Sequence, residues 1–331
     1  MQRRRILLLS VLLSSLIAAL ILLNPARRAP VQPAYNGRTL ESWLTVYDSV
    51  APPAYDDIVL AFTTTPAAAT GAQQIQKRRQ AEFAIRHIGT NAIPFLLHWI
   101  TQPGGARVQL PAALRDLRIA RSPVFNRFTQ DMSAQYHLLG FHGFRILGET
   151  ASNAIPCLVE IMNATNSSAF SELAMKALGW TGPGAFEPLA EVVQDTSFTN
   201  RWRRPLAMVE LACVLRNMPN PCKAAPLILS MAQEKDPQVV GYSMSCLRYF
   251  CNCEAAPAAV EALTRALADP NPYVRTSAAH SLSAFPAYAR SGAPLLLKAL
   301  EDNTPDVRFP ASSTVLLTAP ETLTNSLRAR K

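Results

Sequence analysis

Short apolar stripes recur along this chain at a helical spacing. The segment NAIPFLLHWI at 91–100 returns as NAIPCLVEIM at 153–162, and related segments follow at 185–194, 224–233, 259–268 and 292–301. Counting forward from the aligned proline, the first, second, fifth and sixth residues are nearly always apolar. This spacing marks one face of a helix and excludes a β-strand, in which side chains alternate with a period of two.

A second apolar pattern lies between these segments, at 169–180, 239–250, 274–285 and 307–318. The aligned positions, which are prolines except for Glu261 in the fifth segment, are 32 to 38 residues apart after an opening interval of 62 that contains an insertion at 102–135. Each unit is therefore predicted to be two antiparallel helices, with Asn91 and Asn153 at the N-cap of the first helix. Because one such pair cannot bury its apolar faces alone, the units are expected to stack into a solenoid.

The loops before the second pattern carry a more specific signature. In the fifth unit, the sequence DPNPYVR at 269–275 is followed by Ala278, Ala279 and Leu282. This pattern resembles HEAT repeats of the short bacterial form, and the resemblance covers about residues 75–318. It implies an all-α fold, an α-solenoid of about six stacked antiparallel helix pairs. The motif is specific for the fold and says little about activity, because the same repeats serve scaffolds, adaptors and a few enzymes.

The N-terminal region reads as a membrane anchor. Residues 6–23 form an apolar run without a charge, long enough to cross a bilayer, and residues 1–5 contain three arginines. The positive-inside rule then leaves 1–5 in the cytoplasm and the remainder in the periplasm of a bacterial inner membrane. A cleaved signal peptide with secretion of the protein is the alternative. Residues 24–36 contain three prolines and are predicted to be a tether.

The segment 37–74 is expected to cap the first repeat. A helix from Thr39 to about Tyr47 would place Leu40, Trp43 and Leu44 on one face. A peptide-binding tryptophan at position 43 is the functional alternative to a capping role. The lead-in YNGRTLESWL at 35–44 is similar to that of uncharacterised membrane-anchored bacterial HEAT-repeat proteins.

Most of the net positive charge lies at the two ends of the chain. The formal net charge is +9, but five arginines lie in 1–30 and three further basic residues lie in the tail 319–331, so the body is about neutral. No nucleic-acid partner is therefore expected. The hydrophobic content of 49% also excludes a disordered chain.

No chemical motif points to an enzyme. The glycine cluster at 179–184 lacks the lysine and the preceding strand of a phosphate loop, and it is expected to be a turn between helices. The five histidines are scattered over several repeats, and no HExxH occurs. We expect no catalytic residues, no metal and no cofactor.

The six cysteines divide into two groups. Cys157, Cys213 and Cys246 lie within apolar helical patterns and are expected in the core. The other three lie in turns of consecutive repeats, and neighbouring turns of a stacked array are close together. A disulfide from Cys222 to either Cys251 or Cys253 is predicted, because the compartment is expected to be oxidising.

Two surfaces are candidates for binding a protein or peptide partner. The first-pattern helices are expected to line the concave face of the solenoid, where the exposed column comprises His98, Glu160, Ser230, Arg265 and Lys298. The insertion 102–135 mixes arginines with aromatic residues: Arg115, Arg118, Arg121, Phe125 and Phe128. The alternative is that the insertion packs on the array and has only a structural role.

These features predict a non-catalytic, membrane-anchored, extracytoplasmic scaffold or adaptor. The repeats also resemble those of bilin-lyase subunits, and this resemblance implies an alternative, a chromophore-attachment enzyme or its chaperone subunit. Tetrapyrrole binding would distinguish the second function from the first.

Overall fold

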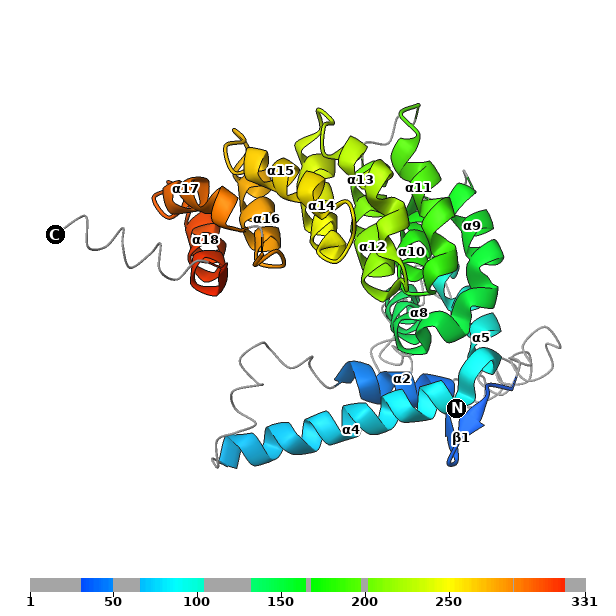
Figure 1. Cartoon of the computed structure of the whole chain (residues 1–331). Helices are drawn as coiled ribbons and strands as arrows, with labels where there is room; N and C mark the ends of the chain where they lie inside the picture. Colours follow the sequence, from blue (N-terminus) through cyan, green and yellow to red (C-terminus); the bar gives the residue numbers. More distant parts are fainter. Residues whose placement is uncertain are drawn as a thin grey trace, which may run out of the picture.

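A computed structural model describes residues 31–49, 66–103, 132–164, 168–197, 202–287 and 289–318. They form a helical repeat solenoid that curves as an arch (Figure 1). Along the outer side of the arch lie α5 (Ile93–Ile100), α9 (Ile155–Asn163), α11 (Phe186–Gln194), α13 (Ala225–Met231), α15 (Ala256–Ala266) and α17 (Ala289–Ala299). Along its inner side lie α8 (Ser133–Leu147), α10 (Ser168–Leu178), α12 (Arg203–Asn217), α14 (Pro237–Leu247), α16 (Pro272–Leu282) and α18 (Pro305–Thr318).

The two layers pack differently. Neighbouring inner helices pack closely on one another, whereas neighbouring outer helices spread apart, which curves the array. Small residues permit this close approach: a Cβ atom on Gly241 of α14 would lie 2.2 Å from Cε1 of Tyr273 on α16. The apolar core runs between the layers and includes the fully buried rings of Phe144, Phe250 and Phe285.

The first-pattern helices begin differently from the prediction. Asn91 and Asn153 were expected as N-caps, but they lie within the 3-10 helices η2 (Gly89–Ala92) and η4 (Gly148–Ala154). The 3-10 turn leads directly into the α-helix and supplies backbone acceptors, so a side-chain cap is not needed there. Side-chain caps occur instead at the inner helices, where Asp236 and Asn271 accept hydrogen bonds from backbone amides at 2.9 Å.

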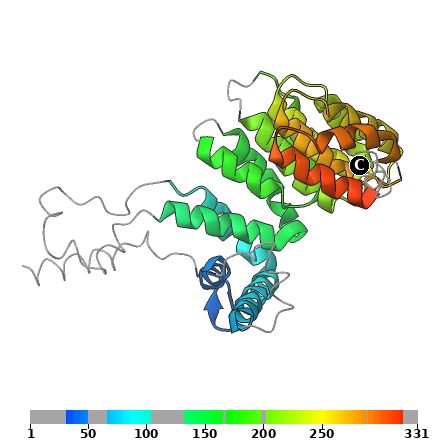
Figure 2. The same cartoon turned by 90° about the vertical axis from the view of Figure 1, so that its left-hand side faces the viewer.

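The N-terminal residues close the first repeat, as the sequence predicts. The helix α2 (Leu40–Ser49) packs on α4 (Pro66–Ile88) and α8, with Leu40, Leu44 and Tyr47 buried. A short hairpin precedes it, formed by β1 (Ala34–Tyr35) and β2 (Arg38–Thr39) with its turn at 36–37. This hairpin packs on α4, so the end of the predicted tether belongs to the fold. Figure 2 shows α2 and α4 beneath the array at its N-terminal end.

Several predicted segments lie outside the described residues. These are the membrane anchor at 6–23, most of the tether, most of the insertion and the basic tail. Among the helices that the structure describes, none combines the length and apolarity needed to cross a membrane.

Candidate interaction surface

The solvent-facing side of the inner layer, here called the inner face, carries a row of cations and aromatic rings. Each inner helix buries one side against the outer layer and leaves a stripe of half-buried or exposed residues on the other, such as Tyr242 and Ser245 on α14. Near the C-terminal ends of these helices the stripes bring Arg145, Arg216 and Arg248 onto one surface, here called the arginine row.

Trp180 joins the first two members of the arginine row. Trp180 lies two residues after the end of α10. The guanidinium carbon of Arg145, on α8, lies 5.9 Å from the centroid of the tryptophan ring. The guanidinium carbon of Arg216, on α12, lies 5.6 Å from the same centroid. A tryptophan ring attracts cations through its quadrupole, so the ring holds both side chains on the inner face.

Tyr249 and His280 continue the row toward the C-terminus. Burial raises the pKa of Tyr249, while the charges of Arg248 and Arg216 oppose that shift. The Nη1 atom of Arg248 lies 2.9 Å from Nε2 of His280 on α16. Burial and the neighbouring Arg248 lower the pKa of His280, which keeps the imidazole neutral and able to accept this hydrogen bond.

At its N-terminal end the row reaches the capping helix. The hydroxyl of Tyr47 accepts hydrogen bonds from Nη2 of Arg78, at 2.6 Å, and from Nη2 of Arg145. The Arg78 guanidinium also lies 4.0 Å from the centroid of the Tyr47 ring. Nearby, Nδ1 of His142 lies 3.5 Å from Asp48. Burial, chiefly, with Arg145 and Arg78, lowers the pKa of His142.

Few carboxylates offset these cations. In the part of the chain that the structure describes, none of the three arginines of the row forms an ion pair with a carboxylate. Glu210 on α12 is 5% exposed, and burial raises its pKa to about 8, so it is mostly protonated at neutral pH. Glu172 is paired with Lys176 at 2.6 Å. The arginine row therefore carries three cations that form no ion pair within the described residues.

The predicted concave column lies on the opposite side of the array. His98, Glu160, Ser230, Arg265 and Lys298 belong to α5, α9, α13, α15 and α17, which form the outer layer, so the expectation that first-pattern helices line the concave face was wrong. The physical reason is the small residues of the second pattern. They let neighbouring second-pattern helices approach closely, so the array curves toward that layer.

Shallow clefts open where the outer helices spread apart. One of about 270 Å³ between α13 and α15 includes Arg265, which is paired with Glu261 at 2.7 Å. Another of about 410 Å³ between α15 and α17 includes Lys298. Each cleft is lined by charges of both signs. The insertion candidates Arg115, Arg118, Arg121, Phe125 and Phe128 lie outside the described residues.

The arginine row was missed by the sequence reasoning, although a signal was present. Arg216 and Arg248 each directly follow the last buried leucine of an inner helix, Leu215 and Leu247. An alignment of the second pattern by that leucine places these arginines in one column. Trp180 follows the corresponding Leu178 by two residues.

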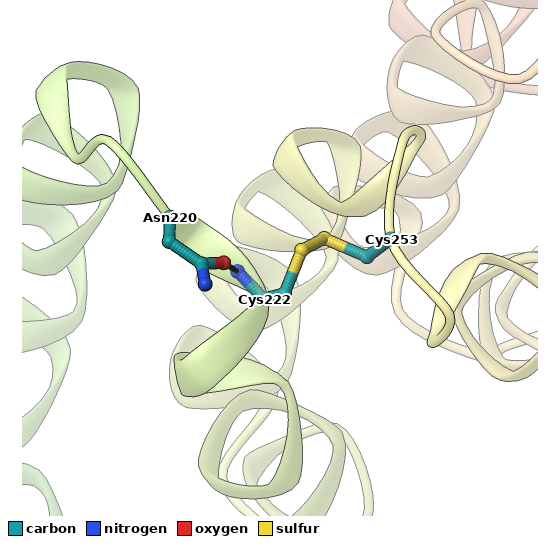
Figure 3. The surroundings of a disulfide bond; sticks show 3 residues. All are labelled: Asn220, Cys222 and Cys253. Atoms are coloured by element: carbon teal, nitrogen blue, oxygen red, sulfur yellow. Dashed lines mark hydrogen bonds between the residues drawn. A yellow bond between two sulfur atoms is a disulfide. The ribbon is translucent and has the colours of Figure 1, made fainter.

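A disulfide joins Cys222 and Cys253, one of the two pairings that the sequence left open (Figure 3). Cys222 lies in η6 (Pro221–Ala224), and Cys253 lies after η7 (Arg248–Phe250), so the bond connects equivalent turns of neighbouring repeats. The Cα atoms are 5.5 Å apart. The Asn220 side chain accepts a hydrogen bond from the backbone amide of Cys222 at 3.2 Å, which fixes this turn.

The remaining cysteines only partly match the prediction. Cys246 is fully buried and Cys213 is half-buried, but Cys157 is exposed rather than in the core, because the exposed side of an outer helix carries it. Burial raises the pKa of Cys213 to about 11 and raises that of Cys246 as well. Among the described residues, no group of three His, Cys, Asp or Glu side chains converges as a metal site would require.

Comparison with known proteins identifies the repeats. The sequence model of the family described as HEAT repeats matches residues 224–314. Residues 224–314 carry HEAT repeats. The match covers the last three helix pairs of the array and includes Cys253, while Cys222 lies two residues before it. No curated protein matches the chain.

Solved repeat structures are similar to the helical array at low sequence identity. A designed armadillo repeat protein in complex with the peptide (KR)4 is 13% identical, with 68% of this chain and 99% of that chain covered and a TM-score of 0.40. An engineered protein is 14% identical over 88% of each chain, with a TM-score of 0.43. The Kap95p structure with RanGDP is 12% identical, covers 85% of this chain and 41% of that chain, and has a TM-score of 0.46.

Proposed function

We propose that this protein is a non-catalytic, membrane-anchored, extracytoplasmic scaffold that binds a segment of another protein on the inner face of its HEAT array. The observation that carries the proposal is the pair of contact groups on that face, one joining Tyr47, Arg145, Trp180 and Arg216 and the next joining Arg248 and His280. Curved repeat arrays present extended concave surfaces of this kind to extended partners.

The compartment and the anchor rest on two features. The apolar run at 6–23 follows three arginines and is long enough for one membrane span. The Cys222–Cys253 bond supports an oxidising compartment, because structural disulfides are rare in the cytoplasm. Both features agree with an anchored protein whose repeat array lies outside the cytoplasm.

The absence of catalysis is proposed from the chemistry of the titratable side chains. A reactive cysteine requires a thiol with a lowered pKa, whereas the pKa values of Cys213 and Cys246 are raised by burial. His280 forms a hydrogen bond with Arg248, and the pKa of His142 is lowered chiefly by burial. These side chains support packing and surface organisation rather than nucleophilic chemistry.

Site-specific photo-crosslinking tests the binding surface. A photoreactive residue in place of Ser245 reports on the inner face, and the same residue in place of Ser230 is the matched control on the outer layer. The full-length tagged protein is irradiated in membranes of its host, and the products are identified by mass spectrometry. We expect one stoichiometric adduct from position 245 and none from position 230. Adducts only from position 230, or none from either, would refute the assignment.

Topology is tested separately. Bacterial alkaline phosphatase fused after Lys331 is active only outside the cytoplasm, and we expect an active fusion that stays in the membrane fraction. An inactive fusion would overturn the compartment, and an active fusion released into the soluble fraction would replace the anchor by a cleaved signal peptide.

A further inference from the structure

The arginine row indicates what kind of segment the inner face binds, and this inference rests on the proposed scaffold function. We propose that the inner face binds an extended acidic peptide segment of the partner, whose carboxylates pair with Arg145, Arg216 and Arg248. Aromatic or apolar side chains between the carboxylates would contact Trp180 and Tyr249. Positive charge and half-buried rings on the same face are complementary to such a segment.

The arrangement of the cations favours a peptide carboxylate. Arg216 is exposed, and Arg145 and Arg248 are half-buried against aromatic rings or a neutral imidazole. An arginine held by stacking keeps its N–H groups available and loses less rotamer freedom on binding. Contacts with rings thus organise these side chains without neutralising their charge.

The spacing of the row suits an extended chain. Arg216 and Arg248 come from the neighbouring inner helices α12 and α14, and packed helix axes are about 10 Å apart. An extended peptide in the polyproline II conformation advances about 9 Å in three residues and repeats its side-chain direction every third residue. Acidic residues three positions apart can therefore reach successive arginines from one side of such a peptide.

The charges of the two layers differ, which argues for one specific face. The exposed outer helices carry Glu160, Glu187, Glu191 and Glu261 beside Arg265 and Lys298. An acidic segment is repelled from part of that layer and attracted to the inner face. Nucleic acid fits less well, because the body of the chain is about neutral and a long polyanion requires cations along its whole path.

Fluorescence anisotropy with defined probes tests the inference. The full chain in neutral detergent is titrated into a labelled twelve-residue peptide with Glu at every third position and Tyr among the others. A second peptide carries Gln in place of each Glu, and a single-stranded DNA oligomer of equal charge is the third probe. We expect the Glu peptide to bind at least tenfold more tightly than the Gln peptide, with an affinity that falls as salt rises.

Matched variants locate the binding. The inner variant combines Arg145→Gln, Arg216→Gln and Arg248→Gln, and the outer variant combines Lys223→Gln, Arg265→Gln and Lys298→Gln. We expect the inner variant to lose at least tenfold in affinity for the Glu peptide and the outer variant to bind within twofold of the unaltered protein. The single variant Arg216→Gln is a separate test, because this position is exposed and the change should not disturb folding. We expect a threefold loss of affinity for the Glu peptide, even if the triple variant does not fold.

Several outcomes would overturn the inference. Equal affinity for the Glu and Gln peptides would do so, as would equal losses in the inner and outer variants. Tighter binding of the DNA oligomer, lost in the inner variant, would assign the row to nucleic acid. The crosslink from position 245 separates failure of this inference from failure of the proposed function. If the inner variant still forms that crosslink, the protein binds a partner on the inner face, and the partner segment is not held by carboxylates.

Discussion

Removal of the Cys222–Cys253 disulfide should destabilise the array by an amount set by the loop that it closes. The two cysteines are 31 residues apart in the sequence, and the bond holds two neighbouring turns together. The chain-entropy relation for a loop of this length gives about 3.7 kcal/mol at 25 °C. The loop contains α13 and α14, so the loss concerns the stability of the central repeats.

The assay is urea unfolding of the oxidised full chain, followed by helical circular dichroism. With a slope of about 3 kcal/mol per molar, a loss of this size moves the urea midpoint down by about 1.2 M. The variant Cys222→Ala/Cys253→Ala is compared with Cys251→Ala, which removes the nearby half-buried cysteine and leaves the bond in place. We expect a reducing agent to lower the midpoint of the unaltered protein and of Cys251→Ala, and to leave the double variant unchanged.

A clear result would refute this reasoning. If the double variant and the oxidised protein unfold at the same urea midpoint, the closed loop contributes nothing and the central repeats hold together without it. If Cys251→Ala loses as much as the double variant, packing in the turn rather than the covalent bond accounts for the effect.

Three further predictions concern buried groups. Because the pKa of Glu210 is raised to about 8 in the folded state, the folded protein keeps a proton that the unfolded protein has already released. Stability should therefore fall as pH rises from about 4.5 to about 8. The variant Glu210→Gln should flatten that fall in thermal melts recorded at several pH values. Arg275 holds the pKa of Asp302 below its usual value through hydrogen bonds of 2.7 and 2.9 Å, so this pair stabilises the fold at neutral pH and the contribution is lost as pH falls through the lowered pKa. Asp302→Asn should cost about 1 kcal/mol at pH 7 and nothing at pH 2 in denaturant titrations. Gly143→Ala should lower the free energy of unfolding by about 1–3 kcal/mol although alanine favours helices, because the new Cβ atom would lie 2.3 Å from a methyl group of Leu96. An unchanged melting temperature would contradict the close packing of α5 on α8.

Much of the fold follows from local sequence. The apolar spacing predicts the paired helices and their order, and Leu40, Leu44 and Tyr47 predict the capping helix. The hairpin at 34–39 was missed although Asn36-Gly37 is a strong turn signal, since both residues adopt positive φ there. Its strands are only two residues long, so no alternating apolar pattern marks them.

The candidate site was harder to predict because it depends on curvature. The sequence predicts which residues of each helix are exposed, and His98 and Lys298 are indeed exposed. It does not say which layer faces inward, because that follows from contacts between helices about 35 residues apart, such as Gly241 against the Tyr273 ring. Assigning the exposed columns to the wrong layer therefore moved the predicted partner surface to the outer side.

The sequence by itself determined the elements of this protein: the helical repeats, their number and pairing, the capping helix and the cysteines placed in adjacent turns. Periodicity, proline positions and spacing act locally, so they can be read along the chain. Tertiary structure alone decided the direction of curvature, the partner of Cys222 and the row that joins Arg145 to Trp180 and Arg216. These depend on side chains brought together from different repeats, and their distances are fixed only when the helices pack.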